Sequence, residues 1–274
     1  MSESVRAVER ALDILLCFSQ DGPALSLTQI AEQVGMHKST VHRLLATLEN
    51  RRFVHRDKAT GLYRLGFRFI EMASLVLQDV GLRRWAQPYL QHLSAECGET
   101  IDLAVLDGSH VIYLDVVESP QRVKIAAAVG QRLPAFCTAS GKAFMAYLPD
   151  DEVHNILDKG LTKYTEHTVL SLADLSEDLR LTRERGFAIS EQEFENDIHA
   201  VAAPILDSSG YPVAVIAVVG PSFRLPRERM LTLGRSLQAT TDAIAHQVGL
   251  TALTAIISKT AAPANAGQAS QGRD

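Results

Sequence analysis

The sequence predicts an α+β fold divided between a small helical front domain and a larger domain built on an antiparallel sheet. Apolar residues follow helical spacing through most of the first 50 residues, whereas strand-like runs become frequent after residue 100. Charge divides the chain in the same way. Residues 1–68 carry ten Lys/Arg and seven Asp/Glu, a net charge of +3, while the remainder carries seventeen against twenty-five, a net charge of −8. A basic module ahead of an acidic one favours nucleic-acid contact at the front.

Composition excludes several classes of protein. No run approaches the ~20 consecutive apolar residues of a membrane span, and the first residues lack the features of a signal peptide. The cysteines Cys17, Cys97 and Cys137 are scattered without a CxxC pair, and the nine histidines do not cluster at ligand spacing. We therefore expect a cytoplasmic protein without disulfide, metal ion or cofactor.

Three helices are predicted at the front of the chain. The first, in "SVRAVERALDILL", is followed by a breaker at Asp21-Gly22-Pro23. The second starts at Ser26, which is expected to form a capping box with Gln29, and it ends at Gly35. In the third, "STVHRLLATLEN", apolar residues at i, i+3, i+4 and i+7 commit one face to the core. Those residues are Val41, Leu44, Leu45 and Leu48.

The first turns of the third helix are polar and basic on their outer face. Lys38, Ser39, Thr40, His42 and Arg43 lie there. Hydroxyls bond phosphates or base edges, and Arg43 offers two donors to guanine, worth roughly 1–3 kcal/mol of discrimination. Two short helices joined at a glycine are typical of the helix-turn-helix. The alternative is a helical hairpin with a solvated basic face.

A predicted β-hairpin follows this helix directly. Two β-rich runs, Phe53–Arg56 and Leu62–Leu65, flank a polar turn. A hairpin in this position forms a wing, on which Arg56 and Lys58 would lie beside backbone phosphates and set register. We therefore predict a winged helix-turn-helix DNA-binding domain over residues 4–66.

Beyond the hairpin, a linker helix over 67–81 is predicted to lead into a second domain over 82–250, and Pro88 is expected to kink the first helix of that domain. Strands are predicted in "TIDLAVLDGSHVIYLDVVES", "RVKIAAAVG" (122–130) and "FAISEQEF", and on both sides of Gly210, with helices near 140–148, 172–185 and 226–248. An antiparallel sheet flanked by helices is typical of domains that enclose a small ligand. Residues 251–274, rich in Ala, Ser, Gly and Gln, are expected to be disordered.

The stretch "CTASGKAFMAYL" (137–148) allows three hypotheses. It fails as a phosphate-binding loop, because only Gly141 precedes the lysine where that loop needs two glycines. A nucleophile at Cys137 or Ser140 would need a base, and no histidine is marked as one by its spacing or flanks. A strand-to-helix turn capped by Thr138 or Ser140 is expected, and free backbone N–H groups at a helix start attract carboxylates. The stretch therefore favours the rim of a pocket that tolerates anions.

Six blocks of the sequence resemble, in order, those of the IclR (isocitrate lyase regulator) family of bacterial transcription factors. They are "SVRAVERALDIL", "SLTQIAEQVGMHKSTVHRLLATLENRRFV", "YRLGFRFIEMA", "GQRLPAFCTASGKAFMAYLP", "RERGFAISEQEF" and "AVAAPILDSSGYPVAVIAVVGPSFRL", within residues 4 to 249. The resemblance implies a winged helix-turn-helix, a helical linker that also dimerises, and a GAF-like effector domain. It further implies homodimers or tetramers on palindromic double-stranded DNA operators of genes for the catabolism of small organic acids, aromatic compounds or sugars.

The resemblance also implies where a small-molecule effector would bind. In family members that bind small oxoacids, the contacts come from the turn before the "GKA" helix and from the last strands. The matching positions of this chain are Thr138, Ala139, Ser140, Gly141, Ser190, Ala200, Ala217 and Val219. Several of the six positions other than Thr138 and Gly141 are polar in the oxoacid binders, and of these six only Ser140 and Ser190 are polar here. A solvated anion needs its hydrogen bonds replaced, so this lining favours a larger, partly apolar acid such as an aromatic carboxylate. A small polar acid stays as the alternative, and Asp197 stands where the family commonly has Gly.

We therefore expect a ligand-responsive DNA-binding regulator of a catabolic gene cluster, a repressor rather than an activator, and not an enzyme. Effector binding would shift dimer geometry through the linker helix. Such a ligand acts only as far as it binds the DNA-competent and DNA-incompetent states differently, typically by about 1–3 kcal/mol. Two other classes stay open: an enzyme domain fused to a helix-turn-helix, and a non-sensing architectural DNA-binding protein.

Overall fold

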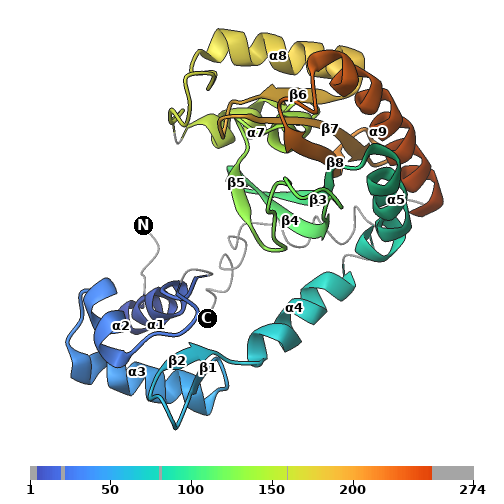
Figure 1. Cartoon of the computed structure of the whole chain (residues 1–274). Coiled ribbons are helices and arrows are strands. Elements are labelled where there is room, and N and C mark those ends of the chain that lie inside the picture. Colours follow the sequence, from blue (N-terminus) through green and yellow to red (C-terminus); the bar gives the residue numbers. More distant parts are fainter. Residues whose placement is uncertain (1–4, 20–21, 80–81, 159, 249–274) are drawn as a thin grey trace, which may run out of the picture. The chain divides into compact units, whose positions relative to one another are not determined.

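The computed structural model describes residues 5–19, 22–79, 82–158 and 160–248 (Figure 1). The chain divides between Asp79 and Val80 into two compact units, here the N-terminal and the C-terminal unit. The predicted tail over 251–274 lies outside the described residues, as do the last two residues of the predicted linker helix. None of the helices in the described ranges has the length and apolarity that crossing a bilayer requires.

The N-terminal unit is a winged helix-turn-helix, as predicted. Val41 and Leu45 are fully buried, so the spacing in the third helix does place that face in the core with Ile14 and Ile30. The capping box at Ser26 is present: its hydroxyl accepts from the backbone N–H of the third helical residue, whose side chain accepts in return. The elements are α1 (Arg6–Leu16), α2 (Leu27–Gln33), α3 (Lys38–Asn50), β1 (Val54–Arg56), β2 (Tyr63–Leu65) and α4 (Arg68–Asp79).

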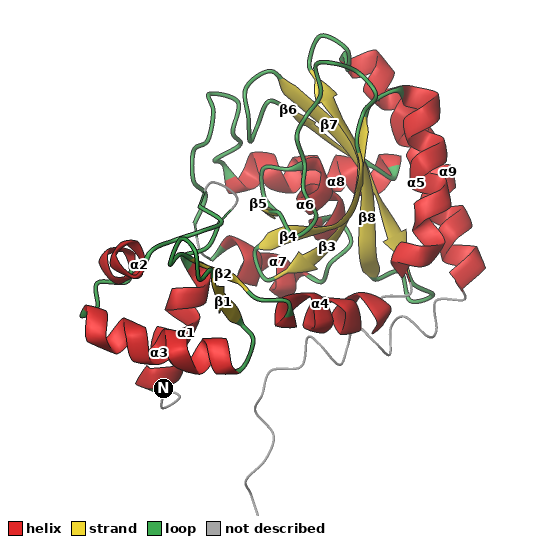
Figure 2. Ribbon diagram, turned by 60° about the horizontal axis from the view of Figure 1, so that its bottom comes forward, coloured by secondary structure: helices red, strands yellow, loops and turns green. Residues whose placement is uncertain are grey.

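The C-terminal unit is a six-stranded antiparallel sheet with helices on both faces (Figure 2). The helices α5 (Leu82–Cys97) and α9 (Arg227–Val248) pack together on one face. On the other face lies α6 (Ala139–Met145), with α8 (Leu172–Arg185) against it, and α7 (Asp150–Leu157) follows α6 in the chain. The strand order is β5-β4-β3-β8-β7-β6, with β3 (Thr100–Asp107), β4 (His110–Val117), β5 (Arg132–Pro134), β6 (Ala188–Glu191), β7 (Ile198–Leu206) and β8 (Pro212–Pro221). An α+β fold of this kind confirms the predicted class.

Two details of the prediction are wrong. The segment 122–130 is not a strand: it contacts the sheet through isolated hydrogen bonds, such as Thr100 Oγ1 to the Ile125 carbonyl, and through the packing of Ala127. The edge strand is β5. The helix α7 was not expected. It begins after Pro149 with three acidic residues in its first turn, and it packs Val153, Ile156 and Leu157 against a buried cluster of the unit. Pro88 lies within α5, which continues to Cys97.

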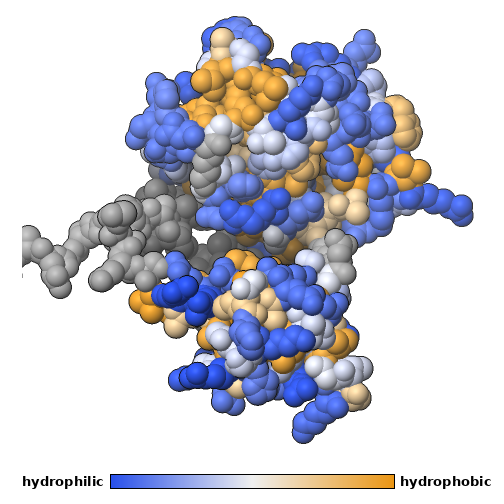
Figure 3. All heavy atoms as spheres, turned by 90° about the vertical axis from the view of Figure 1, so that its left-hand side faces the viewer, coloured by the Kyte–Doolittle hydropathy of each residue, from blue (hydrophilic) through white to orange (hydrophobic). Residues whose placement is uncertain are grey.

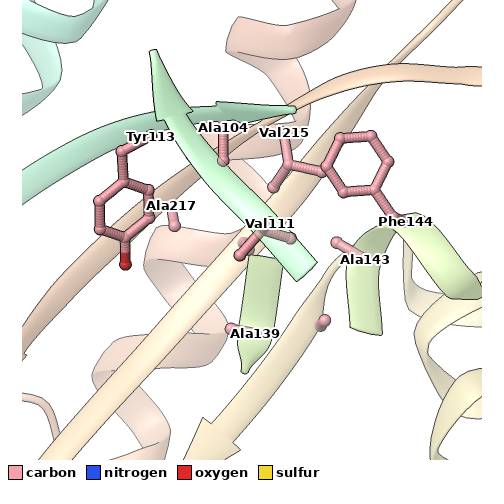
Figure 4. Packing of buried hydrophobic residues seen from close by; sticks show 10 residues of the cluster. Ala104, Val111, Tyr113, Ala139, Ala143, Phe144, Val215 and Ala217 are labelled. Atoms are coloured by element: carbon pink, nitrogen blue, oxygen red, sulfur yellow. The ribbon is translucent and has the colours of Figure 1, made fainter. Parts of the chain in front are cut away.

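Small residues bring α6 close to the sheet. Ala139 and Ala143 of α6 pack against Ala104 of β3 and Ala217 of β8 in one buried cluster (Figure 4). At Gly141 the helix also lies close to the segment that follows β5, because a Cβ atom there would lie 2.0 Å from the Ala135 carbonyl oxygen. The start of α6 is therefore held at a fixed depth in the unit, beside the cavity described below.

Candidate functional site

The first turns of α3 present the predicted polar groups to solvent. Lys38, Ser39, His42 and Arg43 are exposed, and Thr40 is half-buried. The burial of Val41 and Leu45 on the opposite face fixes the rotation of the helix and so determines which side chains face outward. Neither Lys38 nor Arg43 forms an ion pair with another described residue. The ammonium group of Lys38 and the guanidinium group of Arg43 are therefore available to an anionic partner.

The hairpin of β1 and β2 holds the two predicted wing residues. Arg56 lies over the Tyr63 ring at 5.6 Å, and its Nε donates to the Gly61 carbonyl at 3.4 Å. Asp57 shapes the turn, because one of its carboxylate oxygens accepts from the backbone N–H groups of Ala59 and Thr60. These two hydrogen bonds lower the pKa of Asp57. Lys58 at the turn is exposed.

A separate cavity of about 80 Å³ lies in the C-terminal unit, between the start of α6, the segment before β5 and the residues after β6. Most of its lining is apolar. The apolar residues are Ile125, Ala126, Ala127, Leu133, Ala139, Phe194, Ile198, Ala200 and Val219, and the others are Tyr113, Gln131, Cys137, Thr138, Ser140, Ser190 and Glu195. No Lys or Arg is among them. Apolar walls with a few placed polar groups are typical of small-molecule sites.

The polar groups of the cavity differ in their availability. The Thr138 hydroxyl already donates to the Pro134 carbonyl at 2.9 Å and accepts from the Gly141 N–H at 3.3 Å, so it caps α6. The Ser190 hydroxyl donates to the Cys137 carbonyl at 3.4 Å. Burial raises the pKa of the Cys137 thiol to about 12, so the thiol is neutral and poorly suited to nucleophilic attack. Among the described side chains, no group of three His, Cys, Asp or Glu could hold a metal ion.

The structure gathers six of the eight predicted effector residues around this cavity: Thr138, Ala139, Ser140, Ser190, Ala200 and Val219. The other two do not line it. Gly141 faces the backbone of Ala135, and Ala217 is fully buried in the core cluster. Sequence reasoning missed Tyr113, Phe194 and Glu195 among the lining residues. Phe194 is the last residue of the predicted strand "FAISEQEF" and Glu195 follows it, so their position was an available signal.

Comparison with known protein families identifies both units. Residues 7–58 match the IclR helix-turn-helix domain, and residues 74–246 match the bacterial transcriptional regulator IclR C-terminal domain. The chain belongs to the IclR family. It is therefore a transcriptional regulator, and the exposed face of α3 belongs to a helix-turn-helix that binds operator DNA.

Several IclR proteins are similar over nearly their full length. The transcriptional repressor IclR of Escherichia coli is 34% identical over 84% of this chain and 85% of its own. The crystal structure of Thermotoga maritima IclR superposes with a TM-score of 0.73 at 30% identity, over 88% of this chain and 98% of the other. An IclR homologue from Microbacterium hydrocarbonoxydans, solved in complex with 4-hydroxybenzoate, superposes with a TM-score of 0.77 at 24% identity. The superposition covers 88% of this chain and 99% of the homologue. At that identity the likeness of this homologue shows a shared fold.

Next to Ser140 of the cavity lining, one buried side chain is unusual. Asp102 of β3 is fully buried, and neither of its carboxyl oxygens has a hydrogen-bond partner among the described residues. Burial raises its pKa to about 8, and the neighbouring Ser140 hydroxyl only partly opposes that shift. The Ser140 hydroxyl lies near the carboxyl group without meeting hydrogen-bond geometry to either oxygen. Nothing in the sequence pattern distinguishes Asp102 from a solvent-facing strand residue.

Proposed function

We propose that the chain is a repressor that binds a palindromic operator as a homodimer and responds to a small, partly apolar organic acid bound in the cavity of the C-terminal unit. The observation that carries the proposal is the mostly apolar cavity at the start of α6, which belongs to a chain whose other unit binds DNA. Repression is supported by the E. coli relatives IclR and AllR, both named as repressors.

For DNA recognition, we assign base contacts to the first turns of α3 and phosphate contacts to the wing. Arg43 is exposed on α3, where its two donors suit the O6 and N7 acceptors of guanine. Lys38, Ser39, Thr40 and His42 would add contacts to base edges or phosphates. Arg56 and Lys58 lie on the hairpin, and cations there would fix register on the duplex without reading sequence.

Dimerisation is supported by apolar surface on the N-terminal unit, some of which is visible in Figure 3. Val8, Leu12 and Leu16 on α1 are exposed by 55%, 52% and 81%, and their spacing puts them on one side of the helix. Phe67 and Ile70, at the start of α4, are also exposed. Contiguous apolar surface of this kind marks interaction sites, and a two-fold operator calls for a second copy of the same chain.

For the effector, the cavity favours a compact organic acid with an apolar body. Its volume of about 80 Å³ is below the ~150 Å³ of an engineered protein cavity that binds benzene. An aromatic acid would therefore require an outward movement of part of the wall, such as Phe194. Binding of 4-hydroxybenzoate by the Microbacterium homologue supports the aromatic class, and a short oxoacid is the competing class.

Two observations weigh against an enzyme in the C-terminal unit. The Cys137 thiol is neutral, because burial raises its pKa to about 12. His199, whose Nδ1 atom lies 2.8 Å from the Leu225 carbonyl oxygen, does not line the cavity. No nucleophile in the lining is paired with a histidine through a hydrogen bond between described residues.

The test uses the full chain in two steps. Genomic DNA fragments are first selected for binding, and the enriched site is then titrated by fluorescence anisotropy with and without benzoate, 4-hydroxybenzoate, pyruvate and glyoxylate. We expect a two-fold symmetric site and a weaker complex in the presence of one of these acids. An effect of the aromatic acids alone favours the apolar-cavity argument, and an effect of pyruvate or glyoxylate alone contradicts it. Specific DNA binding that no small acid changes would favour an architectural role instead.

A further inference from the structure

The position of Asp102 in the sheet places its side chain on the cavity side. Asp102 pairs in register with Ala217 of β8, and Ala104, two residues further along β3, shares its face of the sheet. Ala104 and Ala217 both belong to the cluster that packs against α6 (Figure 4). Asp102 is therefore directed toward the start of α6, where Ser140 lines the cavity.

A carboxyl group in this position favours its neutral form. Asp102 is fully buried, and both of its oxygens lack a hydrogen-bond partner among the described residues. An ionised carboxylate without a partner is strongly unfavourable in an apolar interior, so such a group keeps its proton instead. The pKa of about 8, raised by burial, agrees with this argument. At neutral pH Asp102 thus carries a hydrogen that it can donate.

The cavity otherwise lacks a group that would balance the charge of an acid. Its lining contains no Lys or Arg, and Glu195 at its rim adds a negative charge. The nearest buried cation on α6 is Lys142, whose Nζ already lies 2.5 Å from Glu193 and 2.6 Å from Asp178. Recognition of an acid must therefore depend on neutral hydrogen-bond donors.

We propose that Asp102 and Ser140 form a donor pair at the inner end of the cavity, and that this pair recognises the carboxylate of the effector. The Asp102 carboxylic acid donates its hydrogen to the Ser140 oxygen, and Ser140 donates its own hydroxyl hydrogen to an oxygen of the bound acid. Both groups keep their covalent protons, and no charge moves. Asp102 acts through Ser140 as a positioning residue, and the inference rests on the proposed acid effector.

The pair makes acid binding dependent on pH, because only protonated Asp102 leaves the Ser140 hydrogen free for the ligand. Ionised Asp102 would instead accept that hydrogen and repel the carboxylate. With a pKa of about 8, the fraction of the protein with Asp102 protonated falls about tenfold between pH 7 and pH 9, and the apparent affinity for the acid falls with it.

Other titratable groups surround the pair, whereas β8 contributes only apolar side chains there. These groups are Tyr113 of β4, Cys137, Lys142 of α6, Glu193 and Glu195. Burial holds the pKa of Tyr113 well above its usual value and that of Cys137 at about 12, so neither titrates in this range.

The experiment is calorimetric titration of the full chain with benzoate, 4-hydroxybenzoate and pyruvate at pH 6, 7, 8 and 9. For the wild type we expect affinity for the bound acid to be about tenfold weaker at pH 9 than at pH 7. Asp102→Asn keeps a donor that does not titrate, so its affinity should stay constant from pH 6 to pH 9. Ser140→Ala should bind at least about tenfold more weakly at pH 7, the loss expected for one hydrogen bond to a charged group. Asp151→Asn, which removes an exposed carboxyl group of α7 outside the cavity lining, is the matched control and should keep the wild-type pH profile.

The outcomes separate this inference from the proposed function. Acid binding that does not change between pH 7 and pH 9, or an Asp102→Asn variant that keeps the wild-type slope, overturns the donor pair and leaves the acid effector intact. Absence of binding of all three acids at every pH overturns both. If Asp102→Asn does not fold, the carbon NMR shift of the Asp102 carboxyl group in the wild type decides. A proton retained at pH 7 supports the pair, and an ionised group at that pH overturns it.

Discussion

The Nζ atom of Lys142 lies 2.5 Å from Oε1 of Glu193 and 2.6 Å from Oδ2 of Asp178, although the Lys142 side chain is only 1% exposed. This buried ion pair joins α6 to the residues after β6, and both segments form walls of the cavity. Burial raises the pKa of Glu193, and the positive charge of Lys142 opposes that shift. The cavity therefore owes part of its shape to an electrostatic link behind its wall.

Lys142→Met should strongly destabilise the C-terminal unit. The substitution leaves the Glu193 carboxylate buried beside Asp178 without a cation, which typically costs about 3–5 kcal/mol. Urea unfolding followed by the fluorescence of Trp85, the single tryptophan, reports on this unit. Adding Glu193→Gln to Lys142→Met should recover part of the loss. Arg180→Met, which removes an exposed ion-pairing residue of α8, is the control and should change stability little. A Lys142→Met variant as stable as that control would contradict the argument.

Gly141→Ala should be more damaging than a glycine substitution in an open turn. The new Cβ would lie 2.0 Å from the oxygen and 2.2 Å from the Cα of Ala135, both backbone atoms, so α6 or the segment between β5 and α6 would have to move. We expect a loss of about 3 kcal/mol or more in the free energy of unfolding. Gly210→Ala is the comparison: at φ +85° with nothing within 4 Å, it should cost only about 1–2 kcal/mol of backbone strain. Equal losses in the free energy of unfolding for Gly141→Ala and Gly210→Ala would mean that α6 can shift to accommodate the new methyl group at little energetic cost.

Much of the N-terminal unit could be predicted because local patterns determine it. The spacing of Val41 and Leu45 fixes which face of α3 is buried, and Ser26 with Gln29 determines the start of α2. These signals act within one turn of a helix. The exposed position of Arg43 follows directly from the buried face of α3.

The cavity was harder to predict because distant segments form it. Residues 122–130 have β-type spacing, but β5 takes the edge of the sheet and leaves Ile125 to line the cavity. The cavity-lining residues Ser140 and Ser190 were predicted by resemblance to a family. The burial of Asp102 was not predicted, because it depends on the packing of α6 over β3. Asp102 and Ser140 are 38 positions apart, and a pattern of neighbouring residues cannot indicate such a contact.

Arg43→Ala and Lys58→Ala should weaken DNA binding in different ways. Loss of Arg43 should cost roughly 1–3 kcal/mol on the selected operator and relax base preference at one position of each half-site. Loss of Lys58 should weaken binding to all sequences alike and lower the slope of log affinity against log salt by about one. Anisotropy titrations at several salt concentrations, with operator variants at each position, distinguish the two. Identical sequence profiles for both variants would contradict this division of roles.

Leu12→Lys with Leu16→Lys should weaken self-association. Two exposed leucines on one side of α1 would be replaced by like charges, which cannot be buried in an interface with a second copy. Light scattering after size exclusion should show a lower mass for this variant than for the wild type at equal concentration. Gln33→Lys with Asn50→Lys adds the same charge at exposed polar positions and should leave the mass unchanged. An unchanged mass for the leucine variant would place the interface elsewhere.

Asp102→Asn should stabilise the C-terminal unit increasingly as pH rises. The folded-state pKa of Asp102, about 8, lies above the value of ~3.9 expected in the unfolded chain. Below about pH 4 both states hold the proton, and the favourable contribution of the protonated group to stability is fully present. Between pH 4 and pH 8 unfolding releases that proton, so the wild type loses stability through this group by up to ~1.4 kcal/mol per pH unit. Above pH 8 the loss levels off.

The amide of the variant does not titrate, so the difference between the two proteins should grow from pH 5 to pH 8 and then stay constant. It should reach a few kcal/mol, with about 6 kcal/mol as the upper limit set by the difference between the two pKa values. Urea unfolding at pH 5, 7 and 9, followed through Trp85, measures it. Leu103→Val, on the opposite face of β3, controls for general weakening of the strand and should show no such trend with pH. A constant difference between Asp102→Asn and the wild type at all three pH values would mean that Asp102 is already ionised in the folded protein, and the donor pair with Ser140 could not form.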